Sequence, residues 1–218
     1  MLRYKRKILL PNNTLKIGDI VFMDDRSKFN LAAKYIRYVE LGGKNPGKNF
    51  VPNHIAEIRD ENPNLNEIML AQADYSGVKP KKLSIWLNNP NVNIIVKRYN
   101  RPLTENEKYI LRTWVIQQEG RGYDWTALLG IYLEYLLVKY SKSEWLKKII
   151  KSLKNPFNIE KRFICSEYIF LSYLQIKISL YKHAQAANIT PYDIFQNKRL
   201  KDVYSNTNYS YTKEKSIK

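Results

Sequence analysis

Residues 92–115 read VNIIVKRYNRPLTENEKYILRTWV and contain the change of pattern that decides the fold class. The first part, VNIIVKRY, is rich in β-branched residues and ends in an aromatic residue, which is typical of a strand. After the Asn-Arg-Pro break, Thr104 followed three residues later by Glu107 forms a capping box, the usual opening of a helix. Apolar residues then recur at helical spacing, at Ile110, Leu111, Trp114 and Val115. The stretch therefore predicts a strand region that gives way to a helical region.

Upstream of this change the chain predicts short strands and one helix. Strand-like segments lie at LKIGDIVFMDD (15–25), HIAEI (54–58) and NEIMLAQA (66–73), separated by Asn, Pro and Gly. Between the first two, FNLAAKYIRYVEL (29–41) spaces its apolar residues at helical intervals, and the glycines after it end the helix. The pattern predicts an antiparallel sheet with one helix over residues 16–100.

Downstream of the change the chain is mainly helical over residues 101–200. The most apolar stretch, WTALLGIYLEYLLVKY (125–140), carries Glu134 and has 16 residues, against about 20 for a membrane span, so it predicts a buried or surface-docking helix. A final helix is predicted from Cys165 toward Tyr181. We expect one α+β domain over residues 1–204, an antiparallel sheet packed against helices, followed by a flexible polar tail at 205–218.

The composition limits the chemistry that the chain can carry. It has 218 residues, 44% of them hydrophobic, with one cysteine and two histidines. A single cysteine cannot form an internal disulfide, and so few Cys and His residues argue against a zinc cluster, so we predict no metal and no cofactor. The apolar run near the N-terminus is shorter than a signal peptide needs, which predicts a cytoplasmic or virion-associated protein without a transmembrane segment.

The charge is strongly positive, with 37 Lys and Arg against 20 Asp and Glu and a formal net charge of +17. The densest clusters lie at residues 3–7, 79–82 and 147–154. Such a surface is either a solvated basic face or a binding surface for a polyanion, such as nucleic acid, an acidic partner or an anionic membrane.

Cys165 lies where a helix begins, in RFICSEYIFLSYL (162–174). An unpaired cysteine is usually a buried small hydrophobic residue. In the first turn of a helix, however, the dipole and the unsatisfied N–H groups favour the thiolate. The N–H groups of Cys165 and Ser166 could also hold an oxyanion, so Cys165 is a candidate nucleophile.

A nucleophilic thiol needs a base, and the chain offers His54 and His183. If the last helix continues, His183 lies roughly 27 Å from Cys165 along its axis, which leaves His54. Candidates to orient the imidazole are Gln72 and Glu67 on the next strand, which point to opposite faces, so that only one can face the site. Glu57 is disfavoured because it points away from His54 on the same strand.

The order of these motifs resembles that of the NlpC-type papain-like cell-wall peptidases, with the cysteine segment moved from the front to the back. The chain carries IGDIVF (17–22), NHIAEI (53–58), LAQADYSGV (70–78) and finally EGRGYDW (119–125) and FICSEYIF (163–170). It is similar to the circularly permuted papain-like family of YaeF/YiiX amidase-like proteins and their poxvirus relatives, and distantly to lecithin:retinol acyltransferase-like enzymes. The likeness runs from about residue 16 to 200, and ITPYDIF (189–195) is also similar to a Thr-Pro-x-Asp stretch of the family.

The resemblance implies a role for each matching residue. Cys165 would be the nucleophile, His54 the general base and acid, and Tyr123 a residue that positions the substrate or the oxyanion. Gln72 stands where such proteins commonly have Glu or His, and a neutral amide orients an imidazole without stabilising its charged form. Glu67 could take that place if the strand register slipped by one residue.

The sequence therefore predicts a cysteine-dependent hydrolase or acyltransferase that cleaves an amide or ester through an acyl-enzyme. Substrates implied by the resemblance are peptides, peptidoglycan stem peptides and lipid acyl groups. The alternative is a non-catalytic binding or virion-type structural protein of the same fold that uses its basic surface to bind nucleic acid or an acidic partner. The sequence leaves the oligomeric state open.

Overall fold

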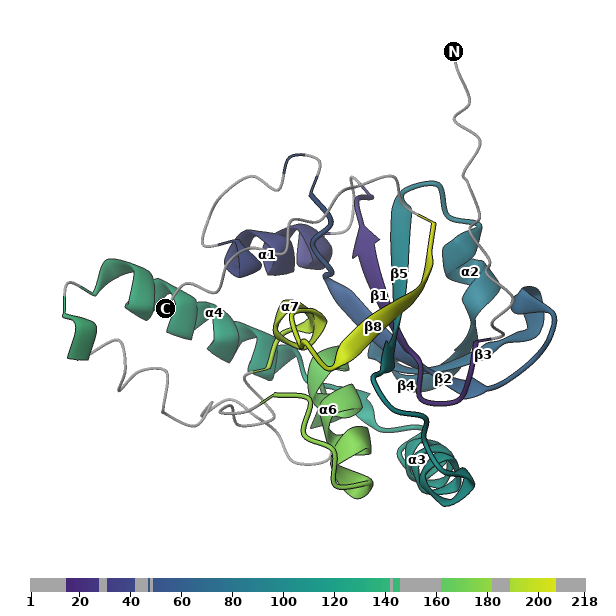
Figure 1. Ribbon diagram of the computed structural model, residues 1–218. Coiled ribbons are helices and arrows are strands. Elements are labelled where there is room, and N and C mark those ends of the chain that lie inside the picture. Colours follow the sequence, from purple (N-terminus) through teal and green to yellow (C-terminus); the bar gives the residue numbers. More distant parts are fainter. Residues whose placement is uncertain are drawn as a thin grey trace, which may run out of the picture.

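The protein has an α+β fold built on a six-stranded antiparallel sheet with the strand order β4-β3-β2-β1-β5-β8 (Figure 1). The computed structural model describes residues 15–27, 31–41, 47, 49–141, 143–145, 162–181 and 189–206. Strands β1 to β4 form a simple meander, in which β2 lies next to β1, β3 next to β2 and β4 next to β3. The last strand, β8, returns to the sheet after the helical half and pairs with β5.

The strands of the sheet are β1 (Ile20–Asp25), β2 (His54–Asp60), β3 (Met69–Asp74), β4 (Gly77–Lys82), β5 (Val92–Tyr99) and β8 (Leu200–Ser205). A separate parallel pair is formed by β6 (Gly122–Tyr123) and β7 (Arg162–Phe163). This pair matters for the site because it places Tyr123 beside the segment that leads into Cys165.

The helices are α1 (Leu31–Glu40), α2 (Leu83–Leu87), α3 (Glu105–Gln117), α4 (Trp125–Tyr140), α6 (Cys165–Gln175) and α7 (Pro191–Phe195), with a 3-10 turn at η1 (Leu65–Glu67). The capping box predicted at the start of α3 is present, because Thr104 and Glu107 each bond the other's backbone N–H. The bounds of α4 and β5 are those predicted from the sequence pattern.

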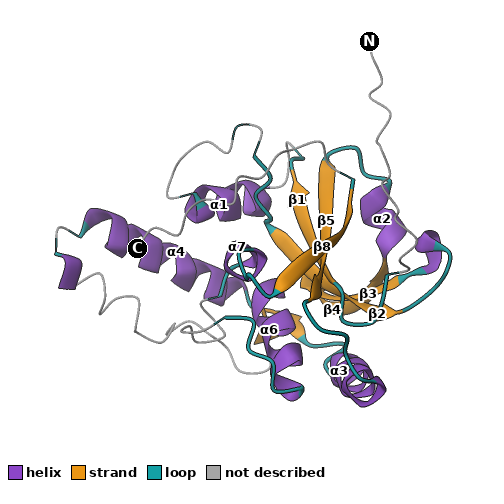
Figure 2. Ribbon diagram, in the orientation of Figure 1, coloured by secondary structure: helices purple, strands orange, loops and turns teal. Residues whose placement is uncertain are grey.

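Alternating residues of the strands build two separate cores, one on each face of the sheet. Ile20, Phe22 and Ile55 face a core that includes Tyr168 and Tyr173 of α6. On the opposite face, residues such as Val21, Ala56 and Leu70 pack with Leu83 of α2. Figure 2 shows α1, α4, α6 and α7 gathered on one side of the sheet and α2 on the other. The period-2 alternation of each strand thus decides which side chains face α6.

Two elements of the sheet side were not predicted, namely β4 and α2. The sequence of β4 is GVKPKK, in which lysines and Pro80 hide the strand signal. Within the described sheet β4 is an edge strand that pairs only with β3, and edge strands tolerate proline and lysine. The expected sheet of residues 16–100 therefore contains a second helix and one further strand.

The final helix is shorter than the sequence pattern predicts, because α6 ends at Gln175 and not near Tyr181. Lys177 adopts a left-handed backbone conformation with φ 59°, and the N–H of Ile178 turns back to the carbonyl of Tyr173 at 3.0 Å. A left-handed residue cannot continue an α-helix, so the chain leaves the helix axis there. Residue His183 lies outside the described residues.

The C-terminal boundary also differs from the expectation, because Ser205 and Asn206 belong to the sheet and not to a polar tail. Ser205 is the last residue of β8. The side-chain oxygen of Asn206 accepts a hydrogen bond from the N–H of Ile94 at 2.6 Å. The backbone N–H of Asn206 donates to the carbonyl of Ile94 at 3.1 Å. The rest of the predicted tail, residues 207–218, lies outside the described residues.

A buried carboxyl lies between the sheet and α6. Glu57 on β2 accepts a 2.6 Å hydrogen bond from the hydroxyl of Ser172, two turns into α6. Burial raises the pKa of Glu57 from 4.5 to about 8, and the hydrogen bond from Ser172 opposes this in part. The carboxyl is therefore protonated near neutral pH, in the interface that positions α6.

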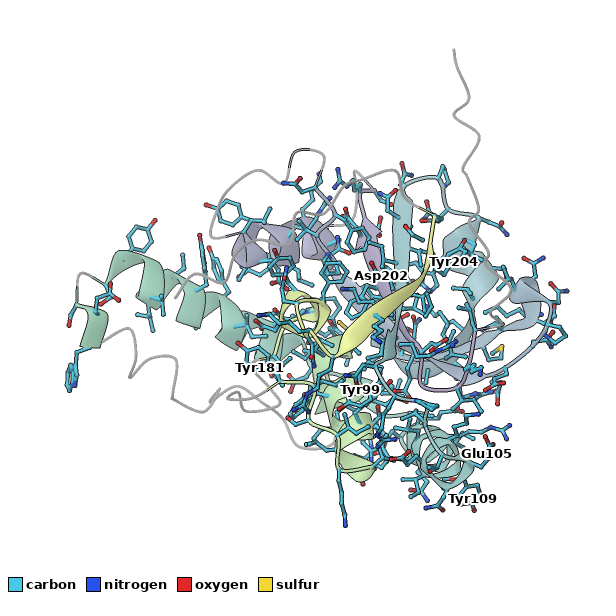
Figure 3. The ribbon with its side chains drawn as sticks, viewed as in Figure 1. Tyr99, Glu105, Tyr109, Tyr181, Asp202 and Tyr204 are labelled. Carbon is cyan, nitrogen blue, oxygen red and sulfur yellow. The ribbon has the colours of Figure 1, made fainter. Side chains whose placement is uncertain are left out.

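We expect Glu57→Gln to stabilise the fold at alkaline pH. Because folding raises the pKa of Glu57, its contribution to stability is fully present below pH 4.5 and is lost as the pH rises through 8. Glutamine cannot ionise, so the variant should gain on the order of 3–5 kcal/mol over the wild type above that range and little in acid. Urea unfolding at several pH values measures this. The control is Glu105→Gln at a carboxyl 88% exposed on α3 (Figure 3), and an equal gain there would contradict the prediction.

Candidate active site

The sulfur of Cys165 lies against the peptide that follows His54. Cys165 is the first residue of α6, and its Sγ lies near enough to the backbone N–H groups of Ile55, Ser166 and Cys165 itself for them to lower the pKa of the thiol. Ile55 is the second residue of β2, directly after His54. The starts of β2 and α6, more than 100 positions apart in the sequence, thereby lie close together.

Cys165 is held as a neutral thiol. It is 2% exposed, and burial raises its pKa from 9.0 to about 12, although the N–H groups of Ile55, Ser166 and Cys165 lower it. The expectation that the start of the helix favours the thiolate is therefore wrong for this conformation. The reason is that the free energy needed to desolvate a thiolate is larger than the stabilisation that the three N–H dipoles provide.

His54 is oriented by Gln72, as the sequence pattern suggested. The Nε2 atom of His54 lies 3.0 Å from the Oε1 atom of Gln72. The amide group of Gln72 donates to the Oδ2 atom of Asp74 at 3.0 Å, which fixes which end of the amide faces the ring. The amide oxygen therefore accepts from Nε2–H, and Nδ1 is the nitrogen that can exchange a proton.

A charged pair lies behind Gln72 and extends the network. Asp74 accepts from Gln72 and forms an ion pair with Lys81 on the neighbouring strand β4. Ser76 also donates to Asp74, through its N–H at 2.8 Å and its hydroxyl at 2.7 Å. Sequence reasoning missed Asp74 and Lys81. The available signal was the spacing of two between Gln72 and Asp74, which puts both side chains on one face of β3.

His54 is also neutral near physiological pH. Burial lowers its pKa below the ordinary value of 6.5, and the hydrogen bond to Gln72 together with the charge of Asp74 opposes the shift. The indole ring of Trp86 covers the imidazole, with ring centroids 5.3 Å apart. Both the thiol of Cys165 and the imidazole of His54 are thus neutral at rest.

Glu67 does not contact His54. It ends the 3-10 turn η1, two residues before β3 begins, and its carboxylate pairs with Lys82 at 2.7 Å with about half of each side chain exposed. The expectation that Glu67 shares the strand of Gln72 fails because NPNLNE forms a turn. Gln72 pairs with Lys79 across β3 and β4 without a slip in register, so Gln72 faces His54.

Tyr123 and Ser166 both lie near the candidate nucleophile. Burial raises the pKa of Tyr123, and the neighbouring Cys165 raises it further, so the Tyr123 hydroxyl lies near the sulfur. The backbone N–H of Ser166 reaches the sulfur, whereas its hydroxyl donates to the carbonyl of Ile189. Ser166 therefore acts at the site through its peptide group, and its side chain fixes the segment before α7.

One cavity lies at His54 and another at Cys165. One of about 200 Å³ lies at His54 and is bounded by polar and aromatic side chains that include Asn53, Asp74, Tyr123 and Trp125. The other, of about 20 Å³, lies at Cys165 between α1, α4 and α7 and is mostly apolar, lined in part by Val39, Leu128, Ile131, Ile164 and Ile189. Ile36 of α1 borders both cavities. The imidazole thus lies at a polar space and the thiol at an apolar one.

A larger cavity, of about 460 Å³, lies elsewhere, at the junction of β1, β5 and α3. It is lined by five cations, of which three are held in ion pairs: Arg98 with Asp19, Arg101 with Glu107 and Lys108 with Glu105. Lys16 and Lys201 line it as well. Cations already paired have little net attraction for a further anion. Neither Cys165 nor His54 lines this cavity, so it is not part of the candidate site.

Neither a metal cluster nor a membrane span is found in the part of the chain that the structure describes. No three His, Cys, Asp or Glu residues in those ranges converge in a way that would ligate a metal ion. Among the same residues, each helix is too short or too polar to cross a bilayer.

The fold is similar to that of a solved structure. The crystal structure of the metalloprotein yiiX from Escherichia coli matches with a TM-score of 0.54 and 13% sequence identity, over 91% of this chain and 99% of that chain. At this identity the likeness shows the fold alone. No protein-family profile and no curated protein matches the chain.

Proposed function

We propose that the protein is a cysteine-dependent hydrolase or acyltransferase with a circularly permuted papain-like fold. The observation that carries the proposal is the approach of the N–H of Ile55 to the sulfur of Cys165, close enough to lower the pKa of the thiol. It joins the start of α6 to the start of β2, where Gln72 holds the imidazole of His54. The likeness to the yiiX structure over nearly the whole chain supports the fold, and the YiiX-like permuted family is part of the proposal.

The reaction would begin with a proton transfer from the thiol of Cys165 to Nδ1 of His54. The sulfur then attacks the carbonyl carbon of an amide or ester, and an S–C bond forms. The N–H groups of Cys165 and Ser166, together with the hydroxyl of Tyr123, are placed to bind the oxyanion. His54 next protonates the leaving amine or alcohol as its bond to carbon breaks. Water or another acceptor finally releases the acyl group from the sulfur, and its proton passes to His54.

The neutral state of the pair makes this a general-base mechanism. A thiol with a pKa of about 12 is not ionised in advance, so the proton has to move as the sulfur attacks. The negative charge of Asp74, which accepts a hydrogen bond from Gln72, stabilises the imidazolium that forms. The third position therefore combines a neutral amide with the Asp74–Lys81 ion pair behind it, and because Lys81 opposes Asp74, the pair replaces only part of the effect of a carboxylate at Gln72 itself.

The apolar cavity at Cys165 favours a substrate whose acyl part is hydrophobic. Its walls come from α1, α4 and α7 and are mostly aliphatic, so a polar group placed there would lose its hydration without gaining hydrogen bonds. At about 20 Å³ the cavity has room for about one water molecule, so its apolar lining acts on the atoms next to the scissile carbonyl and not on a whole acyl chain. The polar cavity at His54 is then the place for the leaving group and the incoming water.

The experiment that tests the function is acyl-enzyme trapping. The purified full chain would be incubated with p-nitrophenyl esters of short and long fatty acids and with an N-acyl amino acid p-nitroanilide, and its intact mass followed over time. We expect a mass increase equal to one acyl group, mapped by peptide analysis to Cys165, with release of nitrophenol. Salt-dependent retention on nucleic acid without any acylation would instead support the non-catalytic binding protein.

We further expect Gln72→Glu to raise the pKa of His54. A carboxylate at 3.0 Å from Nε2 stabilises the imidazolium, so the pKa should move up by about one unit or more. Proton NMR titration measures this directly, because the chain has two histidines and His183→Gln removes the second resonance. The matched control, Gln117→Glu on the exposed side of α3, adds the same charge away from the site. An unchanged His54 titration in Gln72→Glu would contradict the contact between the two side chains.

A further inference from the structure

Helix α4 exposes an apolar stripe to solvent. Its members are exposed by between 37% and 73%, namely Trp125, Leu129, Leu133, Leu137 and Tyr140. At about 100° per residue these positions fall within one third of the helix circumference. We refer to these five residues as the α4 stripe. A row of three leucines between two aromatic residues is an unusual surface in water and marks an interaction site.

The opposite side of α4 is already occupied, so the stripe is not simply the packed face of the helix. Ala127 is buried, and Leu128 and Ile131 pack against the core under α6. Tyr132 contacts Tyr35 of α1 with ring centroids 4.8 Å apart, and a second ring pair joins Tyr38 and Tyr135 at 6.1 Å. In Figure 1, α4 extends away from the sheet with α1 on one side of it, and Figure 3 shows side chains along its outer length.

The charge next to the stripe selects the kind of partner. Between residues 139 and 154 the sequence has six lysines and a single acidic residue, Glu144, in a chain of net charge +17. Lysines that follow an apolar helix in the sequence are attracted to the anionic headgroups of a bilayer. Aromatic residues with a polar edge stand at both ends of the stripe, Trp125 and Tyr140, and Trp145 follows with 70% exposure. Trp and Tyr prefer the headgroup level of a membrane.

We propose that the α4 stripe is a docking surface for an anionic phospholipid bilayer, with the helix lying in the plane of the interface. Sixteen residues give a length of about 24 Å, enough to lie along the surface and too short to cross it. The bilayer covers the three leucines, and Trp125 and Tyr140 lie at the headgroup level.

Docking in this way places the thiol site at the membrane surface. Trp125, the first member of the α4 stripe, also lines the cavity at His54. Leu128 and Ile131, on the inner side of the same helix, line the apolar cavity at Cys165. The helix that contacts the bilayer therefore forms a wall of both cavities. The docking itself does not depend on catalysis.

Vesicle flotation tests the docking. The full chain would be centrifuged with vesicles of phosphatidylcholine alone and with vesicles containing about a third phosphatidylserine. We expect it to float with the anionic vesicles and to bind the neutral ones about tenfold more weakly. Leu129→Ser with Leu133→Ser should reduce the partition coefficient on anionic vesicles by about tenfold for each leucine. Circular dichroism and thermal melting confirm that the variants are folded.

The matched control is Tyr109→Ser with Ile116→Ser, which removes apolar side chains exposed by 69% and 44% on α3, where Figure 3 labels Tyr109. This control should float like the wild type. Flotation unchanged by the α4 substitutions would overturn the proposal, since charge alone would then bind the vesicles. Absence of flotation would also overturn it, and a dimer lost with the same substitutions would assign the stripe to a second copy of the chain. Cys165→Ala should float normally, so a failure of catalysis and a failure of docking are distinguishable.

Discussion

Cys165→Ala is expected to abolish acyl-enzyme formation and to reduce turnover of an activated ester by about 10³-fold or more, to the background rate. Alanine cannot form the S–C bond, and no other cysteine in the chain can replace the sulfur. The substitution removes one buried sulfur atom beside an apolar cavity, so the fold should lose no more than about 1–2 kcal/mol. Intact-mass spectrometry and nitrophenol release measure the two effects.

The control for this variant is Ser172→Ala, which changes another buried residue of α6 without touching the sulfur. It should alter stability and leave acylation at Cys165 intact. If Cys165→Ala retained wild-type turnover while folded, the nucleophile would have to be assigned to another group, and the proposed function would be wrong.

His54→Gln is expected to lower the acylation rate by about 10²–10⁴-fold and to change the shape of its pH dependence. In the wild type the rate should fall in acid with a midpoint below 6.5, because burial lowers the pKa of His54 and only the neutral imidazole is a base. Without that base the reaction depends on ionised thiol. Its rate should then rise about tenfold per pH unit toward the Cys165 pKa of about 12.

The other histidine supplies the control. His183→Gln makes the same chemical change and should keep both the rate and the acid midpoint of the wild type. Single-turnover acylation from acid to alkaline pH distinguishes these outcomes. A profile of His54→Gln that kept its acid midpoint would show that another group accepts the proton, and Asp74 would then be the first to examine.

Much of the fold could be predicted because local patterns and tertiary structure agree. The strand at 92–99, the capping box at Thr104 and the helix at 125–140 all depend on interactions within a few residues, and they are found where the sequence placed them. β4 could not be predicted because Pro80 and its lysines resemble a loop, and only the pairing with β3 makes it a strand. The end of α6 could not be predicted, because no residue pattern indicates the left-handed backbone conformation of Lys177.

The candidate residues came from the order of motifs, and their chemical roles stay predictions. The motifs pointed to Cys165, His54, Gln72 and Tyr123, and the structure places Gln72 against His54 and Tyr123 near Cys165. Glu67 stayed an alternative because a one-residue slip reverses every side chain of a strand, and the sequence alone did not place the turn at η1.

By itself the sequence determined the α+β class, the candidate thiol and imidazole and the net charge of +17, since these follow from residue identity and local periodicity. Only the tertiary structure decided that Asp74 and Lys81 stand behind Gln72, that the thiol is neutral and that the outer face of α4 is exposed. The physical reason is that desolvation and long-range contacts depend on which segments the fold places around a group. The same helix N-terminus that favours a thiolate in water holds a thiol once α1, α4 and α7 surround it.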